Sequence, residues 1–264
     1  MGLTNGVVER KKERGEVRVL LLGQCLSYGY DGVSQDATYP RVAASMLRSS
    51  FPQLRFRLDV KYFYYPTGLK SLLAHRLVLT RPDLAVINLP AMFAATQWRV
   101  NMMYEIAPEL IDTARSFMRR LEATVRGRRS APPAPQTLLD RTFALKEPIS
   151  LAEYEQLIEE AITHSRRISN CRFILMGPGR FNEDTVEQYA VHSPEVWASV
   201  NGMVKRVAER LDVGFINAQE ALGEYGGEVF CLNNHRFSPF GHAIVAREVA
   251  NVIAAEVTGS TNGE

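Results

Sequence analysis

The chain has 264 residues, of which 46% are apolar and 23% charged, and its formal net charge at pH 7 is only +2. This composition is typical of a globular enzyme, and the small net charge gives no support for nucleic acid as a partner. No apolar run approaches the roughly 18 residues that a membrane span requires, and segment 1–16 lacks the apolar core of a signal peptide. We therefore expect a cytoplasmic protein without a membrane partner.

Short apolar segments alternate with amphipathic ones along most of the chain. The first segment, Val17–Gly23, is almost wholly apolar and ends in glycine, as a buried parallel strand does. Further strands are predicted at Leu54–Tyr65, Leu84–Leu89, Cys171–Met176 and Val213–Ile216, and helices at Tyr39–Ser49, Leu69–Leu79, Leu151–Ile168, Glu195–Leu211 and Phe240–Val257. Strands that alternate with helices predict a five-stranded parallel sheet covered on both faces. Ligands bind such sheets outside the carboxyl ends of the strands.

The domain organisation follows from the same pattern. We expect a flexible N-terminal segment at 1–16, one α/β domain at 17–257 and a flexible tail at 258–264. Residues 93–150 are more than one crossover needs, so we interpret them as a helical and loop insertion, with a helix from Val100 to Arg126. A connection of this length is either a lid over the site or a flexible excursion with a solvated basic face.

Cys25 is the first candidate for chemistry, because it follows the first predicted strand by two residues. The amino end of a following helix would favour its thiolate. The structural alternative is that Cys25 is a small buried hydrophobe, as most free cysteines are. The chain has three cysteines, Cys25, Cys171 and Cys231. This number is odd and small, so it does not indicate a disulfide framework.

His235 is the second candidate. It lies in a polar loop before the last predicted helix, whereas His242 falls inside that helix and is expected to pack or to cap it. A cysteine and a histidine supply a nucleophile and a base. Gly68, after the second predicted strand, could present its backbone N–H to an oxyanion, although Pro66 and Gly68 are also ordinary turn residues.

These segments together resemble the SGNH (GDSL-like) hydrolase superfamily. Its first block, Gly-Asp-Ser-Leu-Thr-x-Gly, is similar to Gly23–Gly29, and an aromatic-Pro pair that follows in the family is matched by Tyr39–Pro40. The second-block glycine corresponds to Gly68, and a Pro-Asp-Leu before the third strand to Pro82–Leu84. The last block, with its histidine, Ser-Pro and Gly-His, corresponds to His235–His242. The resemblance implies a flavodoxin-like three-layer α/β/α sandwich of the SGNH hydrolase type.

The sequence departs from the family pattern at three functional positions. Cys25 replaces the nucleophilic serine, and Leu232 occupies the position of the triad aspartate. The third-block asparagine, an oxyanion donor, has no equivalent in Leu89–Phe93. The serine triad of the family is therefore not carried over, and only the histidine and the glycine remain.

Two functional interpretations remain open. In the first, Cys25 forms an acyl intermediate with His235 as base and acts on a thioester or another activated acyl donor, free or carrier-bound, as an acyltransferase, thioesterase or esterase. Gln24, Gly68, Asn88 and Asn233 are the candidate oxyanion or supporting groups, and no cofactor is required. In the second, the chain is a catalytically inactive SGNH-like protein that serves as a binding or scaffolding module.

Three lesser interpretations concern a metal site, another nucleophile and an anion-binding group. Cys25, Cys231, His235 and His242 could form a metal site, but their spacing matches no familiar zinc pattern, so we predict no metal. Ser27, at the threonine position of the family block, could be the nucleophile. Lys70, Arg99 and Arg236 could meet an anionic group such as the phosphate of a carrier, although basic side chains are usually only solvated.

Overall fold

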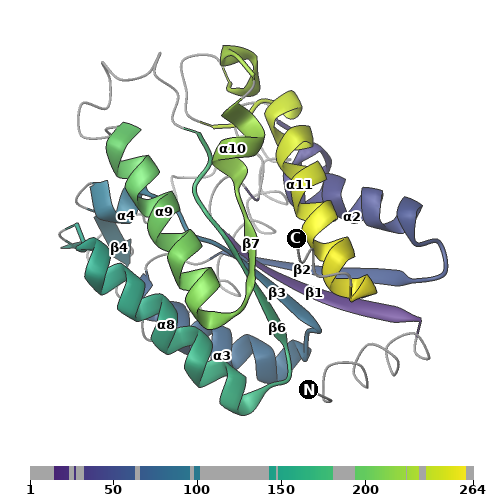
Figure 1. The fold of residues 1–264 in the computed structure, drawn as a ribbon, viewed down its shortest axis with the longest axis horizontal. Coiled ribbons are helices and arrows are strands. Elements are labelled where there is room, and N and C mark those ends of the chain that lie inside the picture. Colours follow the sequence, from purple (N-terminus) through teal and green to yellow (C-terminus); the bar gives the residue numbers. More distant parts are fainter. Residues whose placement is uncertain are drawn as a thin grey trace, which may run out of the picture.

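The computed structural model describes residues 15–23, 27, 33–62, 66–95, 98–101, 143–146, 148–180, 194–223, 225–231 and 236–259. Five strands form one parallel sheet in the order β2-β1-β3-β6-β7 (Figure 1). They are β1 (Glu16–Gly23), β2 (Arg55–Tyr62), β3 (Leu84–Asn88), β6 (Arg172–Met176) and β7 (Gly214–Ile216). This order is the flavodoxin-like one, and it confirms the predicted fold class.

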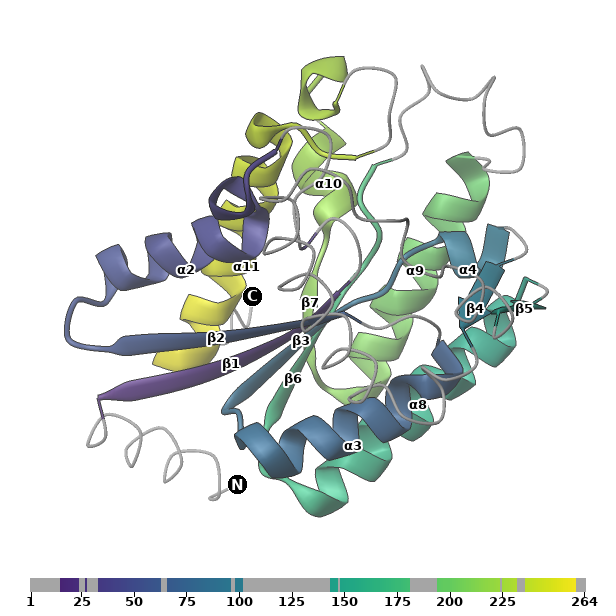
Figure 2. The same ribbon diagram turned by 180° about the vertical axis from the view of Figure 1, so that it is seen from behind.

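Helices cover both faces of this sheet. On one face lie α3 (Leu69–Thr80), α8 (Leu151–Ile168) and α9 (Pro194–Leu211), and on the other α2 (Tyr39–Ser50), α10 (Ala218–Gly223) and α11 (Pro239–Thr258) (Figures 1 and 2). A short helix, α4 (Met92–Ala95), and the 3-10 turns Gln35–Ala37, Pro66–Gly68 and Gly227–Val229 lie in the connections. In the described ranges no helix is long and apolar enough to cross a membrane.

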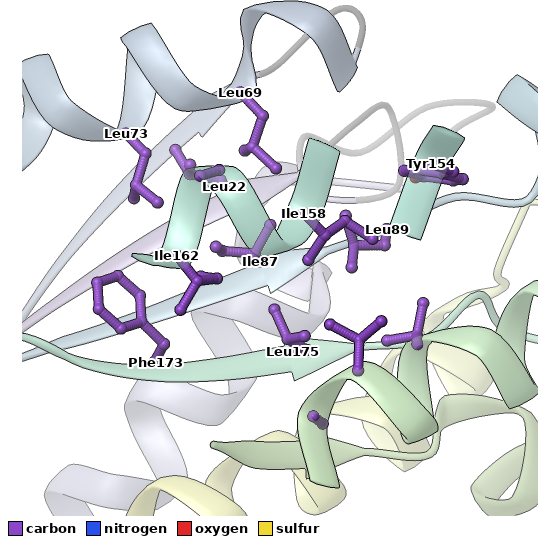
Figure 3. Close-up of a cluster of buried hydrophobic side chains, with 14 of the residues drawn as sticks. Leu22, Leu69, Leu73, Ile87, Leu89, Tyr154, Ile158, Ile162, Phe173 and Leu175 are labelled. Atoms are coloured by element: carbon purple, nitrogen blue, oxygen red, sulfur yellow. The ribbon is translucent and has the colours of Figure 1, made fainter. Parts of the chain in front are cut away.

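The alternation of strand side chains divides the apolar residues between two cores. Along β1, Leu20 and Leu22 face the core under α3, α8 and α9, whereas Val19 and Leu21 face the core under α2 and α11. Figure 3 shows the first of these cores, in which Ile162 of α8 lies among side chains of the strands. Each fully buried Leu or Ile contributes about 1.5–3 kcal/mol, so both faces of the sheet stabilise the fold.

The predicted elements and the observed ones agree closely. The five strands and five long helices are all present, and α8 has the predicted ends. β1 begins one residue earlier than predicted, at Glu16, and α11 ends one residue later, at Thr258. The strand predicted to reach Tyr65 is described as far as Tyr62. The short elements α4 and α10 and the strands β4 (Trp98–Asn101) and β5 (Phe143–Lys146) were not predicted.

The insertion departs from the predicted structure at its base. We expected a helix from Val100, but Val100 and Asn101 belong to β4, which pairs antiparallel with β5. The partner strand lies more than 40 positions away, so no local pattern could predict the pairing. Residues 102–142, which hold the rest of the predicted helix, lie outside the described ranges. Outside the paired strands β4 and β5, the Ile149 amide donates to the Phe93 carbonyl at 3.0 Å. This bond joins the two ends of the predicted insertion.

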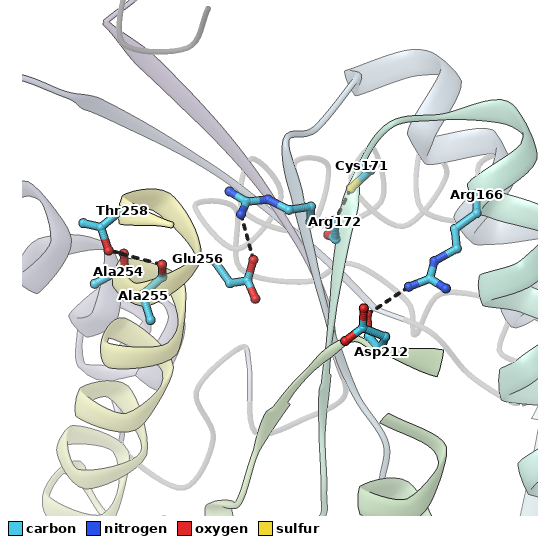
Figure 4. A network of polar contacts seen from close by, with 8 residues as sticks. All are labelled: Arg166, Cys171, Arg172, Asp212, Ala254, Ala255, Glu256 and Thr258. Atoms are coloured by element: carbon cyan, nitrogen blue, oxygen red, sulfur yellow. Dashed lines mark hydrogen bonds and ion pairs between the residues drawn. The ribbon is translucent and has the colours of Figure 1, made fainter. Parts of the chain in front are cut away.

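Polar contacts secure the amino end of the sheet. Arg172 at the start of β6 forms a 2.9 Å ion pair with Glu256 of α11, and Arg166 of α8 donates to the Asp212 carbonyl at 3.1 Å (Figure 4). Cys171 is buried beside them, and its Sγ donates to the Arg172 carbonyl at 3.4 Å. Because this edge is opposite the carboxyl ends of the strands, these contacts are structural, and a buried thiol here is inert.

Candidate active site

The carboxyl ends of β1 and β3 mark the topological switch point of the sheet. The connections that follow these neighbouring strands turn to opposite faces, and ligands bind parallel sheets at such points. Cys25 follows the end of β1 by two residues. Four predicted site residues, Gln24, Cys25, Asn233 and His235, lie outside the described part of the chain. The structure does describe the residues that border them, and these define the surroundings of the site.

Ser27 lies against Gly23, the last residue of β1, and is almost fully buried. A Cβ added to Gly23 would lie only 2.2 Å from Ser27 Oγ, so the strand must end in glycine for Ser27 to lie over it. The two residues that flank segment 24–26 are therefore in contact with each other. Burial also argues against Ser27 as the alternative nucleophile, because its hydroxyl is engaged inside the protein.

Tyr39, the first residue of α2, is the partner of that hydroxyl. Its Oη and Ser27 Oγ are 2.9 Å apart, and Asn88 Nδ2 donates to the same Oη at 3.2 Å. Asn88 ends β3 and is buried, so one of its two amide hydrogens is used within the protein. Its predicted role as an oxyanion donor stays a prediction that depends on the other hydrogen.

His242 of α11 completes this buried cluster. Its Nδ1 accepts a hydrogen bond of 3.1 Å from the Tyr39 amide, and its ring stacks on Tyr39 with the centroids 6.1 Å apart. Phe237 forms an edge-to-face contact with the same ring. Burial lowers the pKa of His242 from 6.5 to about 4, so the ring is neutral at pH 7 and carries its proton on Nε2. The prediction that His242 packs within its helix is confirmed.

The loop that carries His235 is closed at its base. The Cys231 amide donates to the Arg236 carbonyl at 2.8 Å, and Phe230 and Phe237 form an antiparallel bridge next to it. The half-buried Cys231 also directs its Sγ to the Phe237 carbonyl at 3.3 Å. These contacts fix where segment 232–235 leaves the scaffold and where it rejoins it.

The residues after this loop have structural reasons for their identity. Ser238 caps α11, because its Oγ accepts from the Gly241 amide at 3.2 Å, and Pro239 occupies the first helical position, where a proline is tolerated. A Cβ on Gly241 would lie 2.1 Å from the Val229 carbonyl oxygen. Folding alone therefore accounts for the Ser-Pro and Gly-His parts of this segment, and their presence does not itself indicate catalysis.

Gly68 closes the 3-10 turn before α3 and is half-buried. Its φ is −83°, and no described atom lies within 4 Å of a Cβ built on it. Neither backbone conformation nor described packing requires glycine here. The space beside Gly68 would allow a ligand to approach its backbone N–H, as an oxyanion site requires. The role of Gly68 stays a prediction.

Tyr39 is the residue whose importance sequence analysis missed. From the sequence, Tyr39 was noted only as a member of the aromatic-Pro pair and not as a residue of the site. Its hydrogen-bond partners Ser27, Asn88 and His242 are 12, 49 and 203 positions away, so no local pattern could identify them. In the described segments no three His, Cys, Asp or Glu side chains gather as they would around a metal ion. Cys25 and His235 of the alternative metal set lie outside those segments.

Comparisons with known proteins establish the fold. No family model matches the sequence, and no curated protein matches it. A lipase/acylhydrolase from Enterococcus faecalis is 12% identical with a TM-score of 0.59, and the match covers 91% of this chain and 95% of that one. A catalytic mutant of an acetylxylan esterase from Geobacillus stearothermophilus is 16% identical with a TM-score of 0.58, over 91% and 94% of the two chains. At these identities the similarity shows a common SGNH-like α/β fold.

Proposed function

We propose that this chain is an acyl-transfer enzyme in which Cys25 is the nucleophile and His235 the base. The fold is that of proteins named as an acylhydrolase and an acetylxylan esterase. The observation that carries the proposal is the link from Ser27 through Tyr39 to His242. It joins the segment just after Cys25 to the helix just after His235, at the switch point where ligands of such sheets bind.

The reaction begins when His235 accepts the proton of the Cys25 thiol. The thiolate attacks the acyl carbonyl, and the tetrahedral adduct collapses as the leaving group departs with the proton from the imidazolium. An acceptor alcohol, amine or water then loses a proton to His235 and attacks the acyl-cysteine. The C–S bond breaks, and the thiol is restored with its proton. A thiol has a pKa near 8.5 and needs less help from a base than a hydroxyl does.

The donor class follows from the groups that differ from the family pattern. Loss of one oxyanion donor typically lowers the rate of acyl transfer about 10²–10³-fold. A thioester tolerates this loss better than an ester, because exchange between two thiols is close to neutral in free energy. We therefore assign a thioester, or another activated acyl group, as donor. Gly68, Gln24 and Asn88 are the proposed oxyanion donors, and Asn233 is proposed to orient His235.

Intact-mass spectrometry after incubation with a panel of acyl thioesters tests this proposal. We expect a single acyl adduct on the wild-type chain, none on Cys25→Ala, and an adduct that forms at least about tenfold more slowly on His235→Gln, since general base catalysis contributes about 10²–10⁴-fold. Cys231→Ala is the matched control, because Cys231 is a half-buried thiol that could be acylated without catalysis.

The Cys231→Ala chain should acquire the adduct as the wild type does. Absence of an adduct that depends on Cys25, across the panel, would show that the chain is not this enzyme. It would favour the interpretation as a catalytically inactive binding or scaffolding module.

A further inference from the structure

Tyr39 connects three of the segments that border the candidate active site. As the first residue of α2 it has a backbone N–H that the helix itself leaves without an acceptor, and His242 Nδ1 of α11 supplies one. Its side-chain oxygen lies between Ser27, which follows β1, and Asn88, which ends β3. One residue therefore links the last helix to the carboxyl ends of the neighbouring strands β1 and β3.

The chemistry of the partners restricts how this cluster can be arranged. The Asn88 amide nitrogen can only donate, so Tyr39 Oη accepts that bond and shares a second bond with Ser27 Oγ. All three side chains are at least nine-tenths buried. Buried polar groups are costly when they lose hydrogen bonds, so displacement of Ser27 would lose its bond with Tyr39. The position of Ser27 is therefore set by hydrogen bonds as well as by packing.

Ser27 in turn fixes one end of the segment that carries Cys25. Its side chain lies over Gly23, which β1 holds against Tyr62 of β2. Both flanks of segment 24–26 are thus anchored, one by the sheet and one by Tyr39. A displacement of about 1 Å in a catalytic group can cost about 10²-fold in rate, so such anchors matter for a nucleophile.

We propose that Tyr39 is a positioning residue, which acts through Ser27 to hold the Cys25 segment in the geometry that acylation requires. This assignment rests on the proposed function, because it gives Tyr39 a part in the reaction of Cys25. Tyr39 itself need not touch the substrate.

Acylation kinetics of Tyr39→Phe, Ser27→Ala and the double variant test the assignment. Tyr39→Phe removes only the oxygen that Ser27 and Asn88 share. We expect each single variant to lower the maximal rate of Cys25 acylation at least about tenfold and to leave the half-saturating thioester concentration within about twofold of the wild-type value. The double variant should acylate no more slowly than the slower single variant, within about twofold, because both changes break the same link.

Tyr154→Phe is the matched control. Tyr154 is also fully buried, but it lies under the opposite face of the sheet, where its Oη donates to the Pro90 carbonyl at 3.2 Å. This variant also loses a tyrosine hydrogen bond within the protein, one that is partly buried. We expect its Tm to fall as that of Tyr39→Phe does and its maximal acylation rate to stay within about twofold of wild type, a contrast that a merely structural role of Tyr39 would not produce.

The outcomes separate the two proposals. If wild type forms the adduct and Tyr39→Phe acylates within twofold of it, or if the losses of the single variants multiply in the double variant, the positioning role is wrong and the proposed function stands. If wild type forms no adduct, both are wrong. If Tyr39→Phe does not fold, the maximal acylation rates of Ser27→Ala and Tyr154→Phe are compared instead. A Ser27→Ala rate within twofold of wild type would then show that the positioning role is wrong.

Discussion

His242 occupies a site that accepts only the neutral imidazole. The ring is buried between Tyr39 and Phe237, and its Nδ1 must be unprotonated to accept the Tyr39 amide hydrogen. Protonation would both bury a charge and remove this acceptor. The cluster beneath the candidate site therefore contains a group whose ionisation opposes folding.

The stability of the protein should depend on pH through this histidine. Burial lowers the pKa of His242 from 6.5 to about 4, so between these values the unfolded chain binds more protons than the folded one. The contribution of neutral His242 to the free energy of unfolding is therefore complete above pH 6.5, and it is lost as the pH falls to 4. At 1.36 kcal/mol per pKa unit, we expect a loss of about 3 kcal/mol in the free energy of unfolding.

Urea unfolding at a series of pH values, for wild type and for His242→Asn, measures this loss. Asparagine keeps an acceptor near the position of Nδ1 and does not titrate. The difference in unfolding free energy between the two chains should shrink as the pH falls from 6.5 to 4. Curves that stay parallel across this window would show that His242 ionises as freely in the folded protein as in the unfolded one.

Two of the helices that the structure describes, α9 and α11, contain an interior glycine, and the surroundings of these glycines differ. Gly241 in the first turn of α11 lies against the Val229 carbonyl, where an added Cβ would be 2.1 Å from the oxygen. Gly202 in the middle of α9 has only the flexible end of Arg206 near it, at 3.6 Å. Close packing requires the first glycine, whereas nothing in the described surroundings requires the second.

Alanine at these two positions should therefore have opposite effects. Gly241→Ala should reduce the free energy of unfolding by about 1–3 kcal/mol, because backbone must move to admit the methyl group. Gly202→Ala should increase it by about 0.5–1 kcal/mol through helix propensity. Thermal and urea unfolding measure both. If Gly241→Ala increased the free energy of unfolding as Gly202→Ala does, α11 would be able to shift away from Val229 at little cost.

The sequence predicted the long elements because their pattern is local. Alternating or continuous apolar residues define β1 and β3, and α8 shows both a helical period and a Ser150 cap. The pairing of β4 with β5 escaped prediction because each strand has four residues and its partner is remote in sequence. Short elements carry too few residues for a period to be recognised.

The candidate site was predictable only in part, and for a similar reason. Its place after β1 followed from the parallel topology and the resemblance of the blocks. The cluster of Ser27, Tyr39, Asn88 and His242 depends on side chains brought together by four different segments, and no spacing in the sequence reports such contacts. The roles of Cys25 and His235 stay predictions, which the acylation experiments address.

At the scale of the whole molecule, the insertion is attached through a narrow base. Phe93 and Ile149 are hydrogen-bonded, and Asn101 and Phe143 are partners at the far end of the β4–β5 hairpin. Among the residues that the structure describes, the five-stranded sheet and both apolar cores are formed outside 98–146. We therefore predict that the scaffold folds without residues 102–142.

Replacement of residues 102–142 by Asn-Gly should leave a folded protein. A two-residue turn can join Asn101 to Phe143, because these residues are opposite each other on antiparallel strands. We expect the Tm, measured by circular dichroism, to stay within about 4 °C of that of the full chain. For a domain of this size, this shift corresponds to a change of about 1 kcal/mol in the free energy of unfolding. Loss of cooperative unfolding would show that the insertion belongs to the core.

The same variant tests the predicted lid. If the insertion limits the access of water, the acyl-Cys25 adduct should hydrolyse faster on the shortened chain than on the full one, as followed by the decay of the acylated mass. An unchanged lifetime of the adduct would favour the interpretation as an excursion.

The closed base of the His235 loop has a consequence for how this protein can evolve. The contacts that hold the base, from Phe230 and Cys231 to Arg236 and Phe237, use the backbone and residues outside segment 232–235. These contacts therefore do not depend on which side chains segment 232–235 carries. The residue at position 232 can thus be substituted without loss of the described contacts that hold the start of α11 in place.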